Sequence, residues 1–157
     1  MNNTLVENCY FGTGHGASIG SLCGAWLHNI TFRNIVFDGT TAGSRIKTHP
    51  KCAGTVTDVT YENLVMKDVK TPIEISMFYD GDGPLPKTTM QIHYITYRNI
   101  TATGSGADTS VSFDCDPESP CHSIALQDID IEYGDMECKN AFGKNLSHDV
   151  KPKSCVH

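Results

Sequence analysis

A six-residue pattern recurs along the chain, and its spacing constrains the fold more strongly than any other feature of the sequence. Each copy alternates apolar or aromatic residues with polar ones and ends in Asn or Asp followed by an apolar residue. The clearest copies start at positions 30, 59, 95 and 124, so each lies roughly one fixed interval after the one before (59 − 30 = 29, 95 − 59 = 36, 124 − 95 = 29). A repeat of this length is typical of a solenoid, in which each unit stacks on the next. A weaker copy starts at position 4, one slightly shorter interval before the first (30 − 4 = 26).

The hydrophobic period inside each copy is two, which is the period of a β-strand. β-Branched and aromatic residues fill the copies, whereas Gly, Asn, Asp and Thr are common between them. No long stretch shows the 3.6-residue period that a helical solenoid would need. Because strands that recur once per unit stack in parallel, we predict an all-β parallel β-helix of about five coils. These coils should span about residues 4–134 and leave a tail at 135–157.

The Asn or Asp that ends each copy should lie directly above its equivalent in the next coil. We expect these side chains to form an internal ladder that satisfies backbone groups at a turn. Asn99 belongs to the ladder and also to an N-glycosylation sequon, so we expect its buried side chain to stay unmodified. Asn29, in another sequon, precedes the inward-facing Ile30 and should point outward, so we expect Asn29 to carry a glycan. The expected ladder residues are Asn8, Asn34, Asn63, Asn99 and Asp128.

Seven cysteines and four N-glycosylation sequons favour a secreted protein that contains disulfides. Cys23 and Cys52 are separated by one repeat (52 − 23 = 29), so they should face each other on neighbouring coils at a distance that suits a disulfide. Cys9 has no evident partner within the chain, and we expect both its partner and a signal peptide upstream of Met1. The remaining expected pairs are Cys115–Cys121 across a short loop and Cys138–Cys155, which can pin the tail.

Charge and hydropathy exclude two other classes of protein. The chain carries 12 basic and 18 acidic residues, a net charge of −6, whereas a general nucleic-acid-binding protein should be basic. No apolar stretch approaches the roughly 18 residues of a membrane-spanning helix. We therefore expect neither a nucleic acid nor a membrane as a partner.

Two short motifs are candidates for a functional site. His15 lies between two glycines, which leave its ring uncovered, and Arg45 and Lys47 alternate along a predicted strand so that both project from one face. The separation of His15 and Arg45 is close to one repeat (45 − 15 = 30), so we expect the two on adjacent coils. An imidazole beside two cations suits a substrate that carries carboxylates. The alternative is an exposed basic strand and a histidine in a turn.

These motifs resemble those of a known family. The segments 14–21 and 45–47 are similar to two signature motifs of glycoside hydrolase family 28, the polygalacturonases, and 72–79 resembles the family strand that ends in a tyrosine, here Tyr79. The resemblance implies a right-handed parallel β-helix, inverting hydrolysis of α-1,4-linked galacturonate in pectin, no cofactor and a monomer. It also implies that His15 tunes the catalytic carboxylates, that Arg45 and Lys47 bind substrate carboxylates, and that Tyr79 lines a sugar subsite.

The family's catalytic aspartates come from an Asn-Thr-Asp and an Asp-Asp motif that precede Gly-His-Gly, and neither motif occurs in this chain. The resemblance therefore implies that residues 1–157 are the C-terminal portion of one such domain and are inactive alone. A second hypothesis is a non-catalytic module that binds pectic oligosaccharide or a host inhibitor protein. A third is a purely structural β-helix.

Other acidic and histidine residues show no metal-binding pattern. The segment 80–83 resembles the start of a calcium loop but lacks the remaining ligand spacing, and the seven histidines are scattered, so we expect no metal site. Asp114, Asp116 and Glu118 cluster around the short cysteine-closed loop. We interpret them as solvated turn residues rather than as a substitute catalytic pair.

Overall fold

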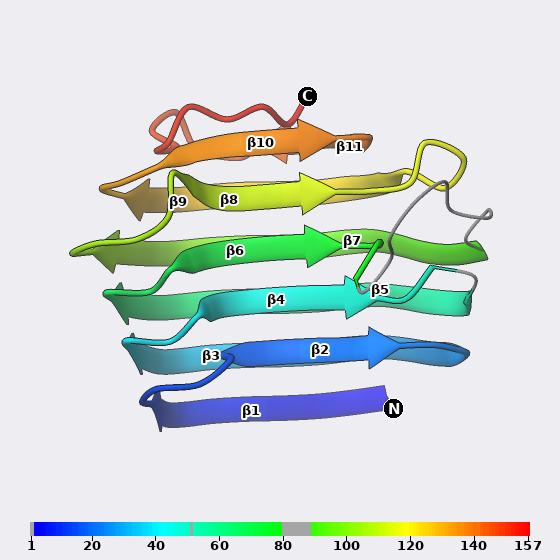
Figure 1. Cartoon of the computed structure of the whole chain (residues 1–157), viewed down its shortest axis with the longest axis horizontal. Helices are drawn as coiled ribbons and strands as arrows, with labels where there is room; N and C mark the ends of the chain where they lie inside the picture. The colour runs from blue at the N-terminus through cyan, green and yellow to red at the C-terminus, as the bar shows by residue number, and fades with distance from the viewer. Residues whose placement is uncertain (1, 51, 80–88) are drawn as a thin grey trace.

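The computed structural model describes residues 2–50, 52–79 and 89–157, and within these ranges the chain forms strands and turns arranged in two parallel sheets (Figure 1). The chain alternates between the sheets, so each coil adds one strand to both, as the predicted parallel β-helix requires. Sheet A contains, in spatial order, β1 (Asn2–Phe11), β3 (Ala25–Asp38), β5 (Ala53–Lys67), β7 (Thr89–Thr103), β9 (Cys121–Ile131) and β11 (Ala141–Asn145). Sheet B contains β2 (Ala17–Leu22), β4 (Ala42–Thr48), β6 (Thr71–Ser76), β8 (Thr109–Asp114) and β10 (Asp135–Lys139). Within the described ranges, no helix has the length and apolar character needed to cross a membrane.

The repeated six-residue patterns stack in register in sheet A, as the sequence predicts. Ile30 pairs with Val59, Val59 with Ile95, and Ile95 with Ile124, and all four side chains are buried between the sheets. Two positions further along, aromatic rings form a parallel row: the Phe32 and Tyr61 rings lie 4.9 Å apart, and the Tyr61 and Tyr97 rings lie 5.4 Å apart. The apolar alternation thus becomes continuous inner rows, whose burial is the main favourable contribution to folding.

Each long strand of sheet A bends where a residue adopts a positive φ. The predicted ladder positions form one such row, with φ between 51° and 55°, in the left-handed region that Asn and Asp tolerate best. Their amides are linked along the row: the Asn34 Nδ2 donates to the Asn8 Oδ1 (3.2 Å), the Asn63 Nδ2 to the Asn34 Oδ1 (3.0 Å), and the Asn99 Nδ2 to the Asn63 Oδ1 (2.8 Å). A second row, five positions earlier in each strand, contains Asn3, Asn29, Asp58, Tyr94 and Ser123.

The ladder exists, but its predicted burial is wrong. Asn99 is exposed, and so is Arg98 before it, because the left-handed bend lets two consecutive residues lie outside before Ile100 returns to the core. Asn29 is exposed as well, and its Nδ2 donates to the Asn3 Oδ1 at 2.7 Å. Exposure and hydrogen bonding therefore do not distinguish the two sequons. Glycosylation of Asn29 stays a prediction.

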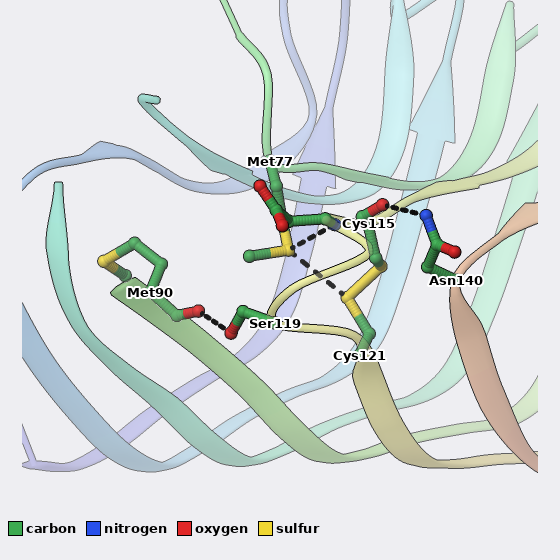
Figure 2. The surroundings of a disulfide bond; sticks show 7 residues. Met77, Met90, Cys115, Ser119, Cys121 and Asn140 are labelled. Atoms are coloured by element: carbon green, nitrogen blue, oxygen red, sulfur yellow. Dashed lines mark hydrogen bonds between the residues drawn. A yellow bond between two sulfur atoms is a disulfide. The ribbon is translucent and has the colours of Figure 1, made fainter. Parts of the chain in front are cut away.

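The three predicted disulfides are confirmed: Cys23–Cys52, Cys115–Cys121 and Cys138–Cys155. Figure 2 shows how the second of these is held. The Asn140 Nδ2 donates to the Cys115 carbonyl at 2.9 Å, and within the enclosed loop the Ser119 hydroxyl donates to the Met90 carbonyl at 2.6 Å (Figure 2). The loop thereby connects β8, β9 and the start of β7. Cys9 is a free thiol, half-buried at the first strand.

The solvated position expected for Asp116 is wrong. Its side chain is only 5% exposed, and its carboxylate accepts the backbone N–H of Glu118 at 2.7 Å. Its own backbone N–H points at the Met77 sulfur, 3.4 Å away, and that sulfur also lies 3.7 Å from the Cys121 sulfur. Asp116 therefore closes the loop from within, because an Asp side chain can bond the backbone two residues ahead.

The solenoid continues past residue 134, where the sequence pattern suggested that the tail begins. β10 and β11 add a further rung, and Met136 and Ala141 extend the buried rows. This rung lacks the aromatic alternation of the earlier copies, which is why the repeat does not reveal it. Residues 146–157 then return across β9: the Lys151 N–H donates to the Ile129 carbonyl at 2.9 Å, and Val156 is buried.

Candidate functional site

The outer face of sheet B carries the predicted site residues. In β4, Ser44, Ile46 and Thr48 point into the solenoid and are fully buried. The period of two therefore turns Arg45 and Lys47 outward on the same face, as expected.

Arg45 is not freely exposed on this face. Only 8% of the residue is accessible, because it lies between Ser18 of β2 and Glu74 of β6, its register partners on either side. The Arg45 Nε donates to the Ser18 hydroxyl oxygen at 3.0 Å, and the Arg45 Nη1 lies 3.9 Å from the Glu74 Oε2. These contacts fix the guanidinium across three adjacent strands.

His15 lies in the turn before β2, one coil away from Arg45 but not opposite it. Its Nδ1 is 3.2 Å from the Thr41 hydroxyl, and its carbonyl accepts the Ser18 hydroxyl at 2.9 Å. Ser18 therefore connects His15 to Arg45. The register differs from the expectation because the coil between β2 and β4 advances 27 residues, from Ser18 to Arg45, rather than 30.

A glycine next to His15 is required by the backbone. Gly16 has a φ of 72°, and a Cβ at this position would lie 2.0 Å from the Ala42 carbonyl oxygen. Only glycine satisfies both conditions, so Gly16 sets how closely the His15 turn approaches β4. The His15 ring itself is exposed.

Lys47 and Tyr79 are in direct contact. The Lys47 Nζ lies 4.0 Å from the centroid of the Tyr79 ring, which is a cation–π geometry. Tyr79 follows β6, and its N–H donates to the Thr48 carbonyl at 3.2 Å, so the ring stays beside β4. The structure thus brings together two residues that are 32 positions apart in sequence (79 − 47).

The site is supported from inside the solenoid by Tyr61. The Tyr61 hydroxyl donates to the backbone carbonyl of Arg45 at 3.2 Å and lies 3.5 Å from that of Ala17. Burial raises the pKa of Tyr61 above its ordinary value, so the hydroxyl remains a neutral donor. Tyr61 therefore connects the core of sheet A to the two strands of sheet B that carry the site.

Sequence reasoning missed Ser18, Glu74 and Thr41 as parts of this site. Ser18 and Glu74 lie within the motifs considered above, but their significance is their register with Arg45. Knowing how many residues separate paired positions on neighbouring strands of sheet B would have identified them. The repeat in sheet A does not give that number.

Two carboxylates on this face lie near cations. Glu74 lies near Arg45, and the Asp114 Oδ1 is 3.5 Å from the Lys139 Nζ. Among the described residues, no group of three or more His, Cys, Asp or Glu side chains could hold a metal ion. The segment 80–83, considered above as a calcium loop, lies outside the described residues.

The fold is a parallel β-helix, and comparison with known proteins assigns the chain to a family. The profile of glycosyl hydrolases family 28 matches residues 1–155, and the chain belongs to that family. It is 33% identical to a polygalacturonase of Prunus persica and 34% identical to one of Brassica napus, each over 99% of this chain. Its fold is similar to that of the polygalacturonase from Erwinia carotovora ssp. carotovora, with a TM-score of 0.75 and 28% identity over 93% of this chain.

The chain is much shorter than these relatives. It spans 42% of the Prunus persica protein, 43% of the Brassica napus protein and 37% of the Erwinia carotovora structure.

Proposed function

We propose that the outer face of sheet B binds galacturonate units of pectin. The observation that carries this proposal is the convergence of His15, Arg45, Lys47 and Tyr79 on one face, with Arg45 fixed by Ser18 and Lys47 stacked on Tyr79. Guanidinium and ammonium groups suit sugar carboxylates, and an aromatic ring beside them suits the apolar face of a pyranose. Membership of the polygalacturonase family supports the same substrate class.

Within this proposal the residues have separate roles. Lys47 supplies the accessible point charge, since Arg45 is largely covered and its guanidinium orients Ser18 and Glu74 as well as a bound carboxylate. Tyr79 lines the neighbouring sugar subsite. His15, exposed at the edge of the face, would act on the protonation of the carboxylates that perform hydrolysis.

Residues 1–157 alone should bind rather than cleave. Inverting hydrolysis needs one carboxylic acid and one carboxylate on opposite sides of the scissile bond. Neither aspartate motif of the family occurs in the sequence, and Glu74 and Asp114 on this face are engaged by Arg45 and Lys139. This pairing favours the second candidate function, a non-catalytic module for pectic oligosaccharide. Three disulfides support an extracellular location for either function.

Binding of an oligogalacturonate, measured by calorimetry over a series of salt concentrations, tests the proposal. Lys47→Ala should weaken binding about tenfold, as expected for loss of one charge-assisted contact, and should reduce the salt dependence. The double change Arg45→Ala and Lys47→Ala should abolish the salt-sensitive binding that this face contributes. Lys67→Ala on sheet A removes the same charge away from the face and should leave binding unchanged. Equal affinities of Lys47→Ala and the parent protein would place the groove elsewhere.

Release of reducing ends from polygalacturonate tests the catalytic part separately. Loss of a positioned acid or base costs about 10²–10⁴-fold each, so turnover by residues 1–157 should be undetectable. Turnover near that of an intact polygalacturonase would show that other carboxylates of this chain perform the reaction.

A further inference from the structure

A hollow lies on the outer face of sheet A, near the C-terminal rungs and on the other sheet from the candidate site. It has a volume of about 480 Å³, within the range of ligand pockets, and is lined by residues of β7, β9 and β11. Tyr94 and Phe142 line it, 56% and 50% exposed, with Ser123 on the strand between them. Two strand spacings, about 10 Å, therefore separate the two aromatic residues at the backbone.

Tyr94 occupies a backbone position that is unfavourable for tyrosine. It belongs to the second row of positive φ values in sheet A, and its own φ is 55°. The equivalent positions in the other coils hold small polar residues: Asn3, Asn29, Asp58 and Ser123. A bulky side chain in the left-handed region is a strained exception, and such exceptions cluster at functional sites. An aromatic ring is therefore kept at this surface against the preference of the backbone.

The Tyr94 ring is held in place by two histidines. The His93 and His122 rings are stacked, with centroids 4.9 Å apart and an interplanar angle of 15°. The Tyr94 ring meets both edge-on, at 5.1 Å from His93 and 6.2 Å from His122. This packing restricts the rotation of the Tyr94 ring before a ligand binds. Less side-chain entropy is therefore lost on binding.

Phe142 and Lys144 reach the hollow from one strand. They are two positions apart in β11 and so share a face, and both are exposed. Gly143 between them lets β11 approach β9 closely, since a Cβ there would lie 1.9 Å from the Ile124 carbonyl oxygen. Within the described part of the chain, Lys144 makes no ion pair, so its ammonium is available to a ligand.

We propose that this hollow is a second binding site for an acidic oligosaccharide, separate from the face of sheet B. Aromatic side chains present apolar surface that matches the C–H face of a pyranose ring. The hydroxyls of Thr96 and Ser123 line the same hollow and can bond sugar hydroxyls, while Lys144 supplies a charge for a uronate carboxylate. The site would hold a second stretch of polymer and does not depend on the sheet B site being functional.

The test uses Lys47→Ala as the parent, so that the sheet B site is weakened, and oligogalacturonate as the probe. Tyr94→Asn introduces the residue found in other coils and relieves the backbone, so the variant should fold at least as well as the parent. Its affinity should fall about tenfold, as expected for loss of an aromatic anchor. Tyr10→Asn, which removes an exposed tyrosine from β1 outside the hollow, is the matched control and should change nothing.

In the same parent, Lys144→Gln should reduce the preference for oligogalacturonate over a neutral galacto-oligosaccharide, while Lys67→Gln should leave it unchanged. Equal affinities of Tyr94→Asn and its parent would overturn the proposal. It would also be overturned if sedimentation showed a dimer that Tyr94→Asn dissociates, because the face would then contact a second copy of the chain. Failure of the sheet B proposal is distinguishable, since it concerns the effect of Lys47→Ala on the unmodified protein.

Discussion

Sheets A and B belong to the same solenoid, yet they differ in how regularly their outer faces repeat. In sheet A, the bend row repeats like residues from coil to coil, as in the Asn34, Asn63 and Asn99 ladder. In sheet B, the row through Arg45 holds Ser18 on one side and Glu74 on the other. Stacking of identical side chains on neighbouring coils stabilises a solenoid. A binding face, by contrast, needs different side chains on each coil. The candidate site of sheet B lies on such an irregular row, and the hollow at Tyr94 lies where a row of sheet A departs from its repeat.

The two sheets also differ in backbone conformation. The long strands of sheet A contain rows of non-glycine residues with positive φ, and in the described ranges no such residue falls within a strand of sheet B. The bends of sheet A change the direction of the chain within a strand, without a loop. Turns of varying length connect the shorter strands of sheet B to those of sheet A, and they move residues such as His15 relative to the next coil.

The ladder provides the largest test of this contrast. Asn63→Ala should lower the free energy of unfolding by about 1–2 kcal/mol, because a Cβ without a local hydrogen bond is disfavoured in the left-handed region. Asn63→Gly keeps the backbone relaxed and should cost less than Asn63→Ala. Denaturant unfolding with a common m-value measures the differences.

Ser76→Ala on the outer face of β6 is the matched control in sheet B, and it should change stability by no more than about 0.5 kcal/mol. If Asn63→Ala were as mild as Ser76→Ala, neither the left-handed bend nor the amide ladder would favour Asn at this position, and the contrast between the sheets would fail.

The buried tyrosines of sheet A provide a smaller test with opposite signs. Tyr61 donates to Arg45 of sheet B, so Tyr61→Phe should lower the free energy of unfolding by about 1 kcal/mol. Tyr97 stacks on Tyr61, but its buried hydroxyl has no hydrogen-bond partner among the described residues. Tyr97→Phe removes an unsatisfied group and should raise stability by about 1 kcal/mol.

Each of these variants is the control for the other, because both delete one hydroxyl from the same aromatic row. Thermal and denaturant unfolding should agree on the signs. A loss of stability in Tyr97→Phe equal to that in Tyr61→Phe would show that both hydroxyls are bonded and that Tyr61 is not a special link between the sheets.

The parts predictable from sequence are those fixed by stacking. The strand copies and the Cys23–Cys52 pair follow from a recurring offset of 29 residues, which repeats because similar coils bury similar rows. The Ser18–Arg45 contact was missed because coil length changes at turns, where no period constrains it. The exposure of Asn99 was missed because alternation alone cannot locate a left-handed bend that places two consecutive residues outside.

The smallest expected effect concerns the stacked histidines on the outer face of sheet A. Partial burial, and then the adjacent His122, lower the pKa of His93 below its ordinary value, and Asp58 opposes the shift. The His93 Nδ1 lies 3.3 Å from the Thr57 hydroxyl. The unfolded chain, with a histidine pKa of about 6.5, therefore binds the proton before the folded chain does. Stability should fall as the pH drops from above that value toward the lower pKa of the folded state, because protons then favour unfolding.

His93→Gln should flatten this part of the pH dependence, and His122→Gln should flatten it partly, because it removes the neighbouring charge but not the burial. Unfolding free energies measured from about pH 7.5 downward follow this loss of stability. The effect should be modest, since His93 is only partly buried and solvent screens the repulsion. Above this pH range the stabilities of the unmodified protein and of His93→Gln should differ by a constant, because His93 is then neutral in the folded and unfolded states. Parallel pH profiles would show that the stacked pair takes up its proton without cost and does not make the outer face of sheet A sensitive to acid.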